Sequence, residues 1–394
     1  MKIAVISPEP LGARMSGIGI RMLELARVLA RRHEVRLGVM EADPGFNPGL
    51  PIFHYKKETV AEHVSDCAAV LVQGEPANYL LSQKFGGAVI VDLYDPFMVE
   101  ALSYDAAAHR FAKASTDIQL QKGDYFLCAH EAQRHFYTGC FYAMGRLSPE
   151  AYQKDPELES LIGIVPFGVP GVPPALDGST PLRSRLRLRP EAKLLFFGTF
   201  YDWYDTDLLQ AVLEDMLRDT DVHFAAVAHL RSSTTPQKKY AAFRAWAEQK
   251  SVLGSQVHIL DWIPYEERLA AYRDCTAGMN LYAPSLETSL SFRTRILDFL
   301  YAGLPVAAVR GGGLDRAFEG QPGLHLCAPD PADVTRVLRP LLDHPADAAE
   351  RGRLSTAARE RFSWEKTAAP LMAYLDRLPS RGTRKPHWWE KVLR

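Results

Sequence analysis

The chain of 394 residues is long for one domain and has room for two of about 150 to 200 residues each. Its 47% apolar and 24% charged residues are typical of a soluble globular protein, and a net charge of −1 argues against a general nucleic-acid binder. The five cysteines are scattered without a CxxC pair, so we expect neither a disulfide framework nor a zinc site. The cysteine usage favours a reduced cytoplasm. No apolar stretch is long enough to span a membrane, which predicts a soluble or at most surface-attached protein.

The first half of the chain has the pattern of a parallel α/β sheet. Short apolar segments predict strands at 3–6, 35–39, 69–72, 88–91, 125–129 and 162–165. Between the first two, a loop rich in Gly and Pro (7–19) precedes a helix expected over 20–32. This order is typical of a Rossmann-type unit. Gly17-Ile18-Gly19 is not a dinucleotide fingerprint, because Met22 occupies the third glycine position.

A second unit of the same kind follows a linker. Residues 169–180 contain three prolines and two glycines without apolar periodicity. Further strands are expected at 193–197, 222–227, 257–259, 277–281, 306–309 and 323–327. Helices are expected over about 331–343 and 346–361, with a final one to about residue 378.

The segment 284–306 carries the clearest functional signal. Ser291 stands where a helix N-cap is expected, and apolar residues then recur at helical spacing up to Gly303, which predicts a left-handed helix end. A helix N-terminus favours anions, and the planar fork of Arg suits phosphate oxygens, so Arg293 and Arg295 are candidates for binding a diphosphate. Asp298, one turn on, is able to accept hydrogen bonds from a ribose diol. A surface helix with an internal Arg–Asp pair is the alternative.

This segment resembles the signature of nucleotide-sugar glycosyltransferases of the GT-B fold, in particular glycosyltransferase family 4. Pro284-Ser285, Glu287 and Ala302-Gly303-Leu304-Pro305 match the pattern, and Asp298 takes the place of the ribose-binding Glu. The chain departs from the pattern in two ways: Glu287 and Asp298 are farther apart than the two acidic residues of the family, and Asp replaces Glu at position 298. The resemblance implies a sugar contact for Glu287 and a ribose contact for Asp298. We expect Glu287, Arg293 and Arg295 to be catalytic.

The resemblance also implies roles elsewhere. Gly17 and Gly19 match a glycine loop that approaches the diphosphate or the acceptor. Asp92, Asp95 and His130, at strand ends of the first half, are candidate contacts of the acceptor or the transferred sugar, although a turn residue before Pro96 and a structural histidine are the ordinary alternatives.

The predicted donor site includes several strand-end residues of the second half. Trp262 and Ile263 lie in a segment that resembles the nucleobase-reading segment of the family. With Thr199, Ser291 and Asp298 they are our candidate contacts of the donor nucleotide. The family's Arg and Lys after the glycine at 198 are missing, and we expect Arg293 and Arg295 to compensate for them. The aromatic residues that follow Thr199 could stack on a base or a sugar, or pack in the core.

The predicted architecture is α/β of the GT-B type, with two Rossmann-like domains whose parallel sheets face across a cleft. The domains are 1–170 for the acceptor, with a crossing helix over 363–394, and 185–362 for the donor, joined by the linker 171–184. A basic tail with two tryptophans (381–394) either contacts the inner membrane face peripherally or docks on its own protein.

The expected function is sugar transfer, with retention, from a nucleotide diphosphate sugar to a saccharide, lipid-linked or small-molecule acceptor, in polysaccharide or glycoconjugate biosynthesis. No cofactor, metal or nucleic acid is expected, and the nucleotide sugar is a co-substrate. The alternatives are a nucleotide-sugar epimerase or pseudo-glycosyltransferase on the same fold, and a non-catalytic scaffold of a polysaccharide assembly complex.

Overall fold

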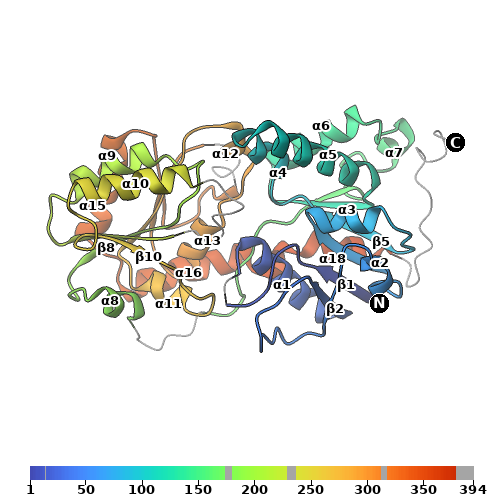
Figure 1. Ribbon diagram of the computed structural model, residues 1–394, viewed down its shortest axis with the longest axis horizontal. Helices are drawn as coiled ribbons and strands as arrows, with labels where there is room; N and C mark the ends of the chain where they lie inside the picture. Colours follow the sequence, from blue (N-terminus) through green and yellow to red (C-terminus); the bar gives the residue numbers. More distant parts are fainter. Residues whose placement is uncertain (14, 174–179, 229–236, 312–316, 379–394) are drawn as a thin grey trace. The chain divides into compact units, whose positions relative to one another are not determined.

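The computed structural model describes residues 1–13, 15–173, 180–228, 237–311 and 317–378. The chain forms two compact units. Unit 1 contains Met1–Gly168, Leu290–Phe292 and the chain from Trp364 onward, and unit 2 contains Val169–Ser289 and Arg293–Ser363. Both have the α/β architecture predicted from the sequence, with one parallel sheet in each (Figure 1).

The sheet of unit 1 has the strand order β3-β2-β1-β4-β5-β6-β7, in which every pairing is parallel. Its strands are β1 (Lys2–Ile6), β2 (Glu34–Val39), β3 (Ile52–His54), β4 (Ala69–Gln73), β5 (Ala88–Asp92), β6 (Tyr125–Cys128) and β7 (Ile162–Ile164). The sequence analysis missed β3, a three-residue edge strand that is only partly buried and therefore leaves little apolar pattern.

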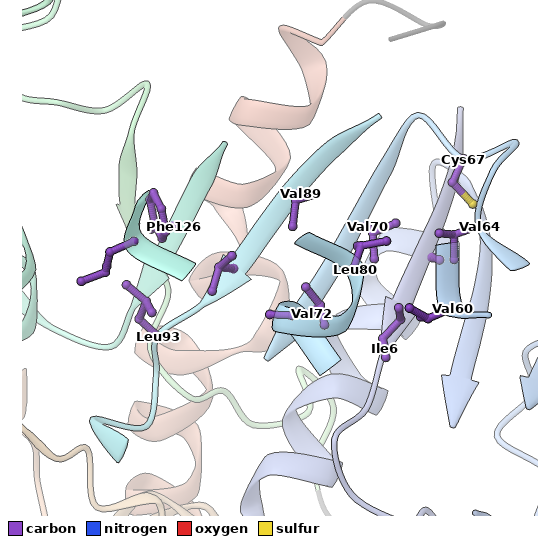
Figure 2. Packing of buried hydrophobic residues seen from close by; sticks show 14 of the residues in the cluster. Ile6, Val60, Val64, Cys67, Val70, Val72, Leu80, Val89, Leu93 and Phe126 are labelled. Carbon is purple, nitrogen blue, oxygen red and sulfur yellow. The ribbon is translucent and has the colours of Figure 1, made fainter. Parts of the chain in front are cut away.

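Helices cover both faces of this sheet. They are α1 (Gly17–Ala30), α2 (Val60–His63), α3 (Glu75–Leu81), α4 (Phe97–Glu100), α5 (Ala106–Lys122), α6 (Glu131–Ala143), α7 (Pro149–Lys154), α17 (Trp364–Thr367) and α18 (Ala369–Asp376), with a 3₁₀ turn at Ala101–Ser103. Figure 2 shows one core layer, where Val70 and Val72 of β4 meet Val60 of α2 and Leu80 of α3. The central strands β1, β4, β5 and β6 are mainly apolar because both faces of the sheet are buried there.

Helices α17 and α18 pack within unit 1 through aromatic contacts. The ring of Tyr374 stacks on Tyr125 with centroids 4.0 Å apart, and Trp364 lies 4.8 Å from Phe167. A side chain at Gly168 would clash with the Trp364 indole, so the close approach requires glycine.

The sheet of unit 2 has the order β10-β9-β8-β11-β12-β13, again with parallel pairing throughout. Its strands are β8 (Lys193–Thr199), β9 (Val222–Val227), β10 (Val257–Leu260), β11 (Ala277–Asn280), β12 (Val306–Val309) and β13 (Leu324–Cys327). Its helices are α8 (Pro181–Leu186), α9 (Thr206–Met216), α10 (Lys238–Gln249), α11 (Arg268–Arg273), α12 (Leu286–Leu290), α13 (Thr294–Tyr301), α15 (Pro331–Asp343) and α16 (Ala348–Phe362).

The two faces of this second sheet are covered by different helices. In Figure 1, α9, α10 and α15 lie on one side and α8 and α11 on the other. Alternate residues of β8 serve the two faces: the ring of Phe196 contacts Tyr272 of α11 and Phe299 of α13, whereas Phe197 contacts Phe200 and Phe224. Helix α8 begins inside the segment predicted as a linker.

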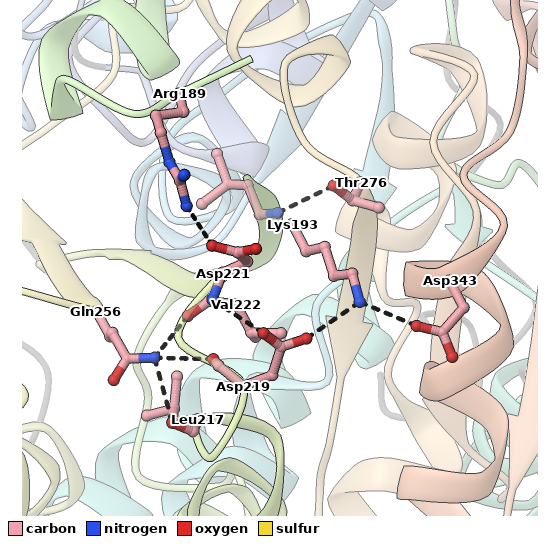
Figure 3. A network of polar contacts seen from close by, with 10 residues as sticks. Arg189, Lys193, Leu217, Asp219, Asp221, Val222, Gln256, Thr276 and Asp343 are labelled. Carbon is pink, nitrogen blue, oxygen red and sulfur yellow. Dashed lines mark hydrogen bonds and ion pairs between the residues drawn. The ribbon is translucent and has the colours of Figure 1, made fainter. Parts of the chain in front are cut away.

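A polar network ties the strands together at their amino ends (Figure 3). The ammonium of Lys193 contacts Asp219 at 3.1 Å and Asp343 at 3.0 Å. The amide of Gln256 donates to three backbone carbonyls, those of Leu217, Asp219 and Val222. Ligands of parallel α/β sheets bind at the carboxyl ends of the strands. Because this network lies at the amino ends, we assign it a structural role.

Candidate functional site

The segment predicted to bind the diphosphate is two short helices rather than one. Helix α12 ends at Leu290 and α13 begins at Thr294, with Arg293 as its N-cap residue. The prediction that Ser291 is the N-cap was therefore wrong. The backbone between the helices is used for tertiary contacts instead: the carbonyl of Leu290 accepts from Gln133, and that of Phe292 accepts from the Tyr94 hydroxyl. Ser291 itself is buried.

The end of α13 follows the prediction. Gly303 has φ +77°, in the left-handed region that favours glycine. Leu304 and Pro305 then lead into β12.

Glu287 and Arg293 form a buried ion pair. A terminal nitrogen of Arg293 lies 2.6 Å from a carboxylate oxygen of Glu287, and the two side chains are only 7% and 6% exposed. The guanidinium also lies over the rings of Tyr282 and Tyr204, at 5.2 and 5.9 Å. Burial opposes the charged form of Arg293, but the Glu287 carboxylate together with Tyr204 and Tyr282 outweighs it, and the pKa of Arg293 is raised. Arg293 therefore serves first to hold Glu287.

Arg295 lies directly against the glycine at the end of β8. Its guanidinium donates to the carbonyl of Phe197 at 3.1 Å and to the hydroxyl of Tyr204 at 2.8 Å. A Cβ on Gly198, whose φ is +96°, would clash with this guanidinium. Arg295 is partly exposed, unlike Arg293. The Arg295 guanidinium thus lies at the end of β8, where the Arg and Lys that the family carries after this glycine are missing.

Asp298 lies one turn further along α13. Its carboxylate is 3.3 Å from the guanidinium of Arg268, and its side chain is 10% exposed. Burial raises the pKa of Asp298, while Arg268 and Arg295 act in the opposite direction. The structure pairs Asp298 with Arg268 of α11, a partner that sequence spacing did not reveal.

Buried polar atoms without partners gather around the same edge. In the part of the chain that the structure describes, neither amide atom of Asn280 has a hydrogen-bond partner, although Asn280 is fully buried at the end of β11. The hydroxyl of Thr206 and Nε of Arg293 are likewise buried without a hydrogen-bond partner among the described residues. Buried polar groups are normally satisfied, so such atoms suggest a water or a ligand. Sequence reasoning missed Asn280, although a polar residue at the end of an apolar strand could have signalled it.

The remaining donor-site candidates lie at other strand ends of unit 2. Thr199 ends β8. Trp262 and Ile263 follow β10 and are partly exposed. The carbonyl of Trp262 accepts a hydrogen bond from Arg185 at 3.3 Å, so this backbone oxygen is engaged within the unit.

In unit 1, Asp92 supports the fold. Its carboxylate binds Arg21 through Nε at 2.6 Å and Nη2 at 3.1 Å, and both side chains are 0% exposed. Arg21 also donates to the carbonyls of Val165 and Pro166. This carboxylate is fully enclosed and paired with Arg21, so its observed role is structural, and the acceptor contact of Asp92 stays a prediction.

The other candidates of unit 1 have distinct surroundings. His130 is buried and caps α6, its Nδ1 accepting from the amide of Gln133 at 3.4 Å. Burial lowers its pKa, opposed by backbone groups of Leu290 and Ser291. Asp95 is partly exposed. Gly17 and Gly19 form the first turn of α1 behind the cap Ser16, so the prediction that they belong to a loop was wrong.

Two further predictions concern metals and membranes. Within the described ranges, no three His, Cys, Asp or Glu side chains gather as they would around a metal ion. Over the same ranges, no helix has the length and apolar character needed to cross a membrane. The tail 381–394, predicted to touch a membrane surface or to dock on the protein, lies outside the described residues.

Comparison with known proteins shows which folds and families this chain is similar to. Residues 206–375 match the family model described as glycosyl transferase-like. HepE of Anabaena, solved with UDP and glucose, superposes with a TM-score of 0.69 at 12% identity, over 95% of this chain and 99% of that one. Sucrose-phosphate synthase of Thermosynechococcus elongatus gives 0.66 at 18% identity, over 95% and 98%. The chain has the two-sheet α/β architecture of the GT-B fold, as the sequence predicted.

One curated relative is more similar in sequence over a short region. D-inositol 3-phosphate glycosyltransferase of Arthrobacter sp. (strain FB24) is 40% identical over 82 residues, which is 21% of this chain and 20% of that protein. The match therefore spans about a fifth of the relative's length.

Proposed function

We propose that this protein transfers a sugar, with retention at the anomeric carbon and without a metal ion, from a nucleoside diphosphate sugar to a saccharide, lipid-linked or small-molecule acceptor. The reaction would serve polysaccharide or glycoconjugate biosynthesis. The glycosyl transferase-like family match and the resemblance to HepE, which was solved with UDP and glucose, support this class of donor.

The observation that carries the proposal is the position of Arg295. Its guanidinium stands against Gly198 at the carboxyl end of β8, where ligands of parallel α/β sheets bind. It is held by two hydrogen bonds and remains partly exposed, so its geometry is fixed while its charge is accessible. A fixed cation at this point stabilises negative charge that develops on a departing diphosphate.

Asp298 extends the same site by one helical turn. Its side chain is mostly buried but retains 10% exposure, and Arg268 fixes its orientation. A carboxylate in this state can accept hydrogen bonds from both hydroxyls of a ribose. Under this proposal the diphosphate binds at Arg295 and the nucleoside lies toward Arg268.

Glu287 would contact the sugar, with Arg293 as its positioning residue. The short, buried contact of 2.6 Å limits the carboxylate to one orientation, as a preorganised site requires. In the proposed step, the bond from the anomeric carbon to the phosphate oxygen breaks as the bond to the acceptor oxygen forms. The acceptor's proton passes to the leaving phosphate, so no further nucleophile is needed.

A thermal-shift screen with UDP, GDP, dTDP and ADP tests the donor site. A ligand that binds only the folded state raises the melting temperature. We expect one nucleotide to stabilise the wild type and to lose most of this effect with Arg295→Gln and with Asp298→Asn. Arg336→Gln is a matched control, because Arg336 lies on α15 and pairs with the adjacent Asp333.

Activity is then measured with the corresponding nucleotide sugars. Release of the nucleoside diphosphate that depends on an added acceptor supports transfer, and the anomeric configuration of the product tests retention. If no nucleotide at millimolar concentration stabilises the wild type, the proposed function is wrong. If Arg336→Gln weakens the effect as much as Arg295→Gln, the assigned position of the diphosphate is wrong.

A further inference from the structure

The guanidinium of Arg295 is held by uncharged groups. Its Nη1 donates to the carbonyl of Phe197 at 3.1 Å and to the hydroxyl of Tyr204 at 2.8 Å. No carboxylate of the described segments lies within ion-pair distance of Arg295, whereas Arg293 is paired with Glu287. Because neutral acceptors fix a guanidinium without neutralising it, the full charge of Arg295 remains for an anion.

Tyr204 belongs to the aromatic loop after β8 and is itself firmly held. It is only 5% exposed, and its ring packs edge-on against Phe197 with centroids 5.1 Å apart. Its backbone forms an antiparallel bridge with Tyr282, and the amide of Asp205 donates to the carbonyl of Leu281. These contacts join the loop to the segment that follows β11. The Tyr204 hydroxyl is therefore fixed in place before a ligand binds.

The same tyrosine contacts both arginines of the segment. The guanidinium of Arg293 lies 5.9 Å from the centroid of the Tyr204 ring, and that of Arg295 lies 5.4 Å from it. An electron-rich ring attracts both cations, whereas the hydroxyl bonds Arg295 alone. The ring and the hydroxyl of Tyr204 thus have separate effects, and a substitution that removes only the hydroxyl acts on Arg295.

We propose that Tyr204 is the positioning residue of Arg295, and that its hydroxyl orients the guanidinium toward the diphosphate of the donor. The inference rests on the proposed function for the identity of that anion. Without the hydroxyl, Arg295 keeps a single hydrogen bond, to the Phe197 carbonyl, and its guanidinium is free to turn. Fixing the side chain beforehand reduces the entropy that is lost when the diphosphate binds.

A double-mutant cycle tests this role with four proteins: wild type, Tyr204→Phe, Arg295→Gln and the double variant. Tyr204→Phe removes the hydroxyl and keeps the ring against Arg293. The matched control is Tyr137→Phe, because Tyr137 is also buried and its hydroxyl donates to a backbone carbonyl, that of Leu93 in unit 1. Affinities for UDP and uridine, or for the pair with the base that the nucleotide screen identifies, are measured by calorimetry.

Tyr204→Phe should weaken UDP binding about two- to tenfold, the effect of freeing one long side chain, and leave uridine binding unchanged. In the Arg295→Gln background the same substitution should have no further effect, since no guanidinium is left to position. Tyr137→Phe should change neither affinity. A purely structural role of Tyr204 would instead weaken both ligands.

Three results would overturn the proposal. An equal loss for UDP and uridine in Tyr204→Phe indicates a structural defect. A loss for UDP that persists in the Arg295→Gln background indicates that the hydroxyl contacts the phosphate itself. Unchanged UDP binding in Tyr204→Phe indicates that the hydroxyl does not position Arg295.

Inorganic pyrophosphate separates this inference from the proposed function, because it presents a diphosphate without a nucleoside or a sugar. Its effect on the melting temperature is measured with the same variants. If pyrophosphate stabilises the protein through Tyr204 and Arg295 while no nucleotide binds, the positioning role holds and the proposed function fails. If nucleotide binding depends on Arg295 but not on Tyr204, the proposed function holds and the positioning role fails. If neither pyrophosphate nor any nucleotide binds, both are wrong.

Discussion

Replacing Asp92 with Asn distinguishes structural support from ligand contact at the end of β5. The substitution keeps the size of the side chain but removes its charge. Arg21 then retains its two carbonyl acceptors, Val165 and Pro166, and loses its only described counter-ion. The result is a buried and uncompensated guanidinium.

The expected loss is large. Breaking a buried ion pair by removing one partner costs about 3–5 kcal/mol. In a unit of 150 to 250 residues, each kcal/mol lowers the melting temperature by about 2–4 °C, so a decrease of roughly 10 °C is expected. The contact of the Arg21 guanidinium with the Tyr94 ring, at 4.4 Å from its centroid, remains and limits the loss.

Thermal and urea unfolding of four proteins measure this effect: wild type, Asp92→Asn, Arg21→Met and the double variant. The double variant should lose less than the sum of the single losses, because it leaves no unpaired charge. Asp117→Asn is the control: its carboxylate pairs with Lys113 on the surface of α5, and exposed pairs contribute less than about 1 kcal/mol.

The reasoning is refuted if Asp92→Asn unfolds like the wild type. If that variant were also to lose saccharide binding, Asp92 would be an acceptor contact, as the sequence first suggested. Strict additivity in the double variant would also contradict the assigned pairing.

Three further outcomes are expected. Gly198→Ala places a Cβ on a residue with φ +96° and against the Arg295 guanidinium. This variant should lower the free energy of unfolding by about 1–2 kcal/mol and weaken stabilisation by nucleotide in a thermal-shift assay. The control Gly139→Ala, whose new Cβ meets open space, should do neither. His258, whose pKa burial lowers to about 4, binds a proton more readily when unfolded, so stability should fall as the pH decreases from 6.5 toward 4. His258→Gln should flatten urea midpoints across that window, and an unchanged slope would contradict this assignment. Phe299→Ala empties a fully buried position and should cost about 3–5 kcal/mol in urea unfolding; a loss below 1 kcal/mol would show that the site collapses around the cavity.

The fold class and most strands could be predicted from the order of amino acids alone. Parallel strands buried on both faces are nearly continuous apolar segments, and such segments are visible without any tertiary information. The left-handed helix end at Gly303 could also be predicted, because a helix end with φ near +77° strongly favours glycine. The short edge strand Ile52–His54 could not be predicted, since it is only partly buried and leaves little apolar pattern.

Which charged residues pair with one another became evident only from the folded structure. Helical spacing suggested Asp298 as a partner of Arg295, yet Asp298 pairs with Arg268 and Arg295 bonds Tyr204. Both partners come from other elements, and ion-pair geometry depends on distances that sequence separation does not encode. For the same reason Ser291 is not a cap: its neighbours' carbonyls bind side chains more than 150 residues away.

The same limit applies to Asp92 and to the aromatic loop after β8. A carboxylate at a strand end has one sequence pattern whether it meets a ligand or a buried arginine, and Arg21 lies 71 residues from Asp92. Tyr201 and Tyr204 differ little in sequence context, but one is partly exposed and the other is buried against Arg295. Burial and charge pairing are properties of the folded chain, because they depend on which distant segments the sheet brings to one edge.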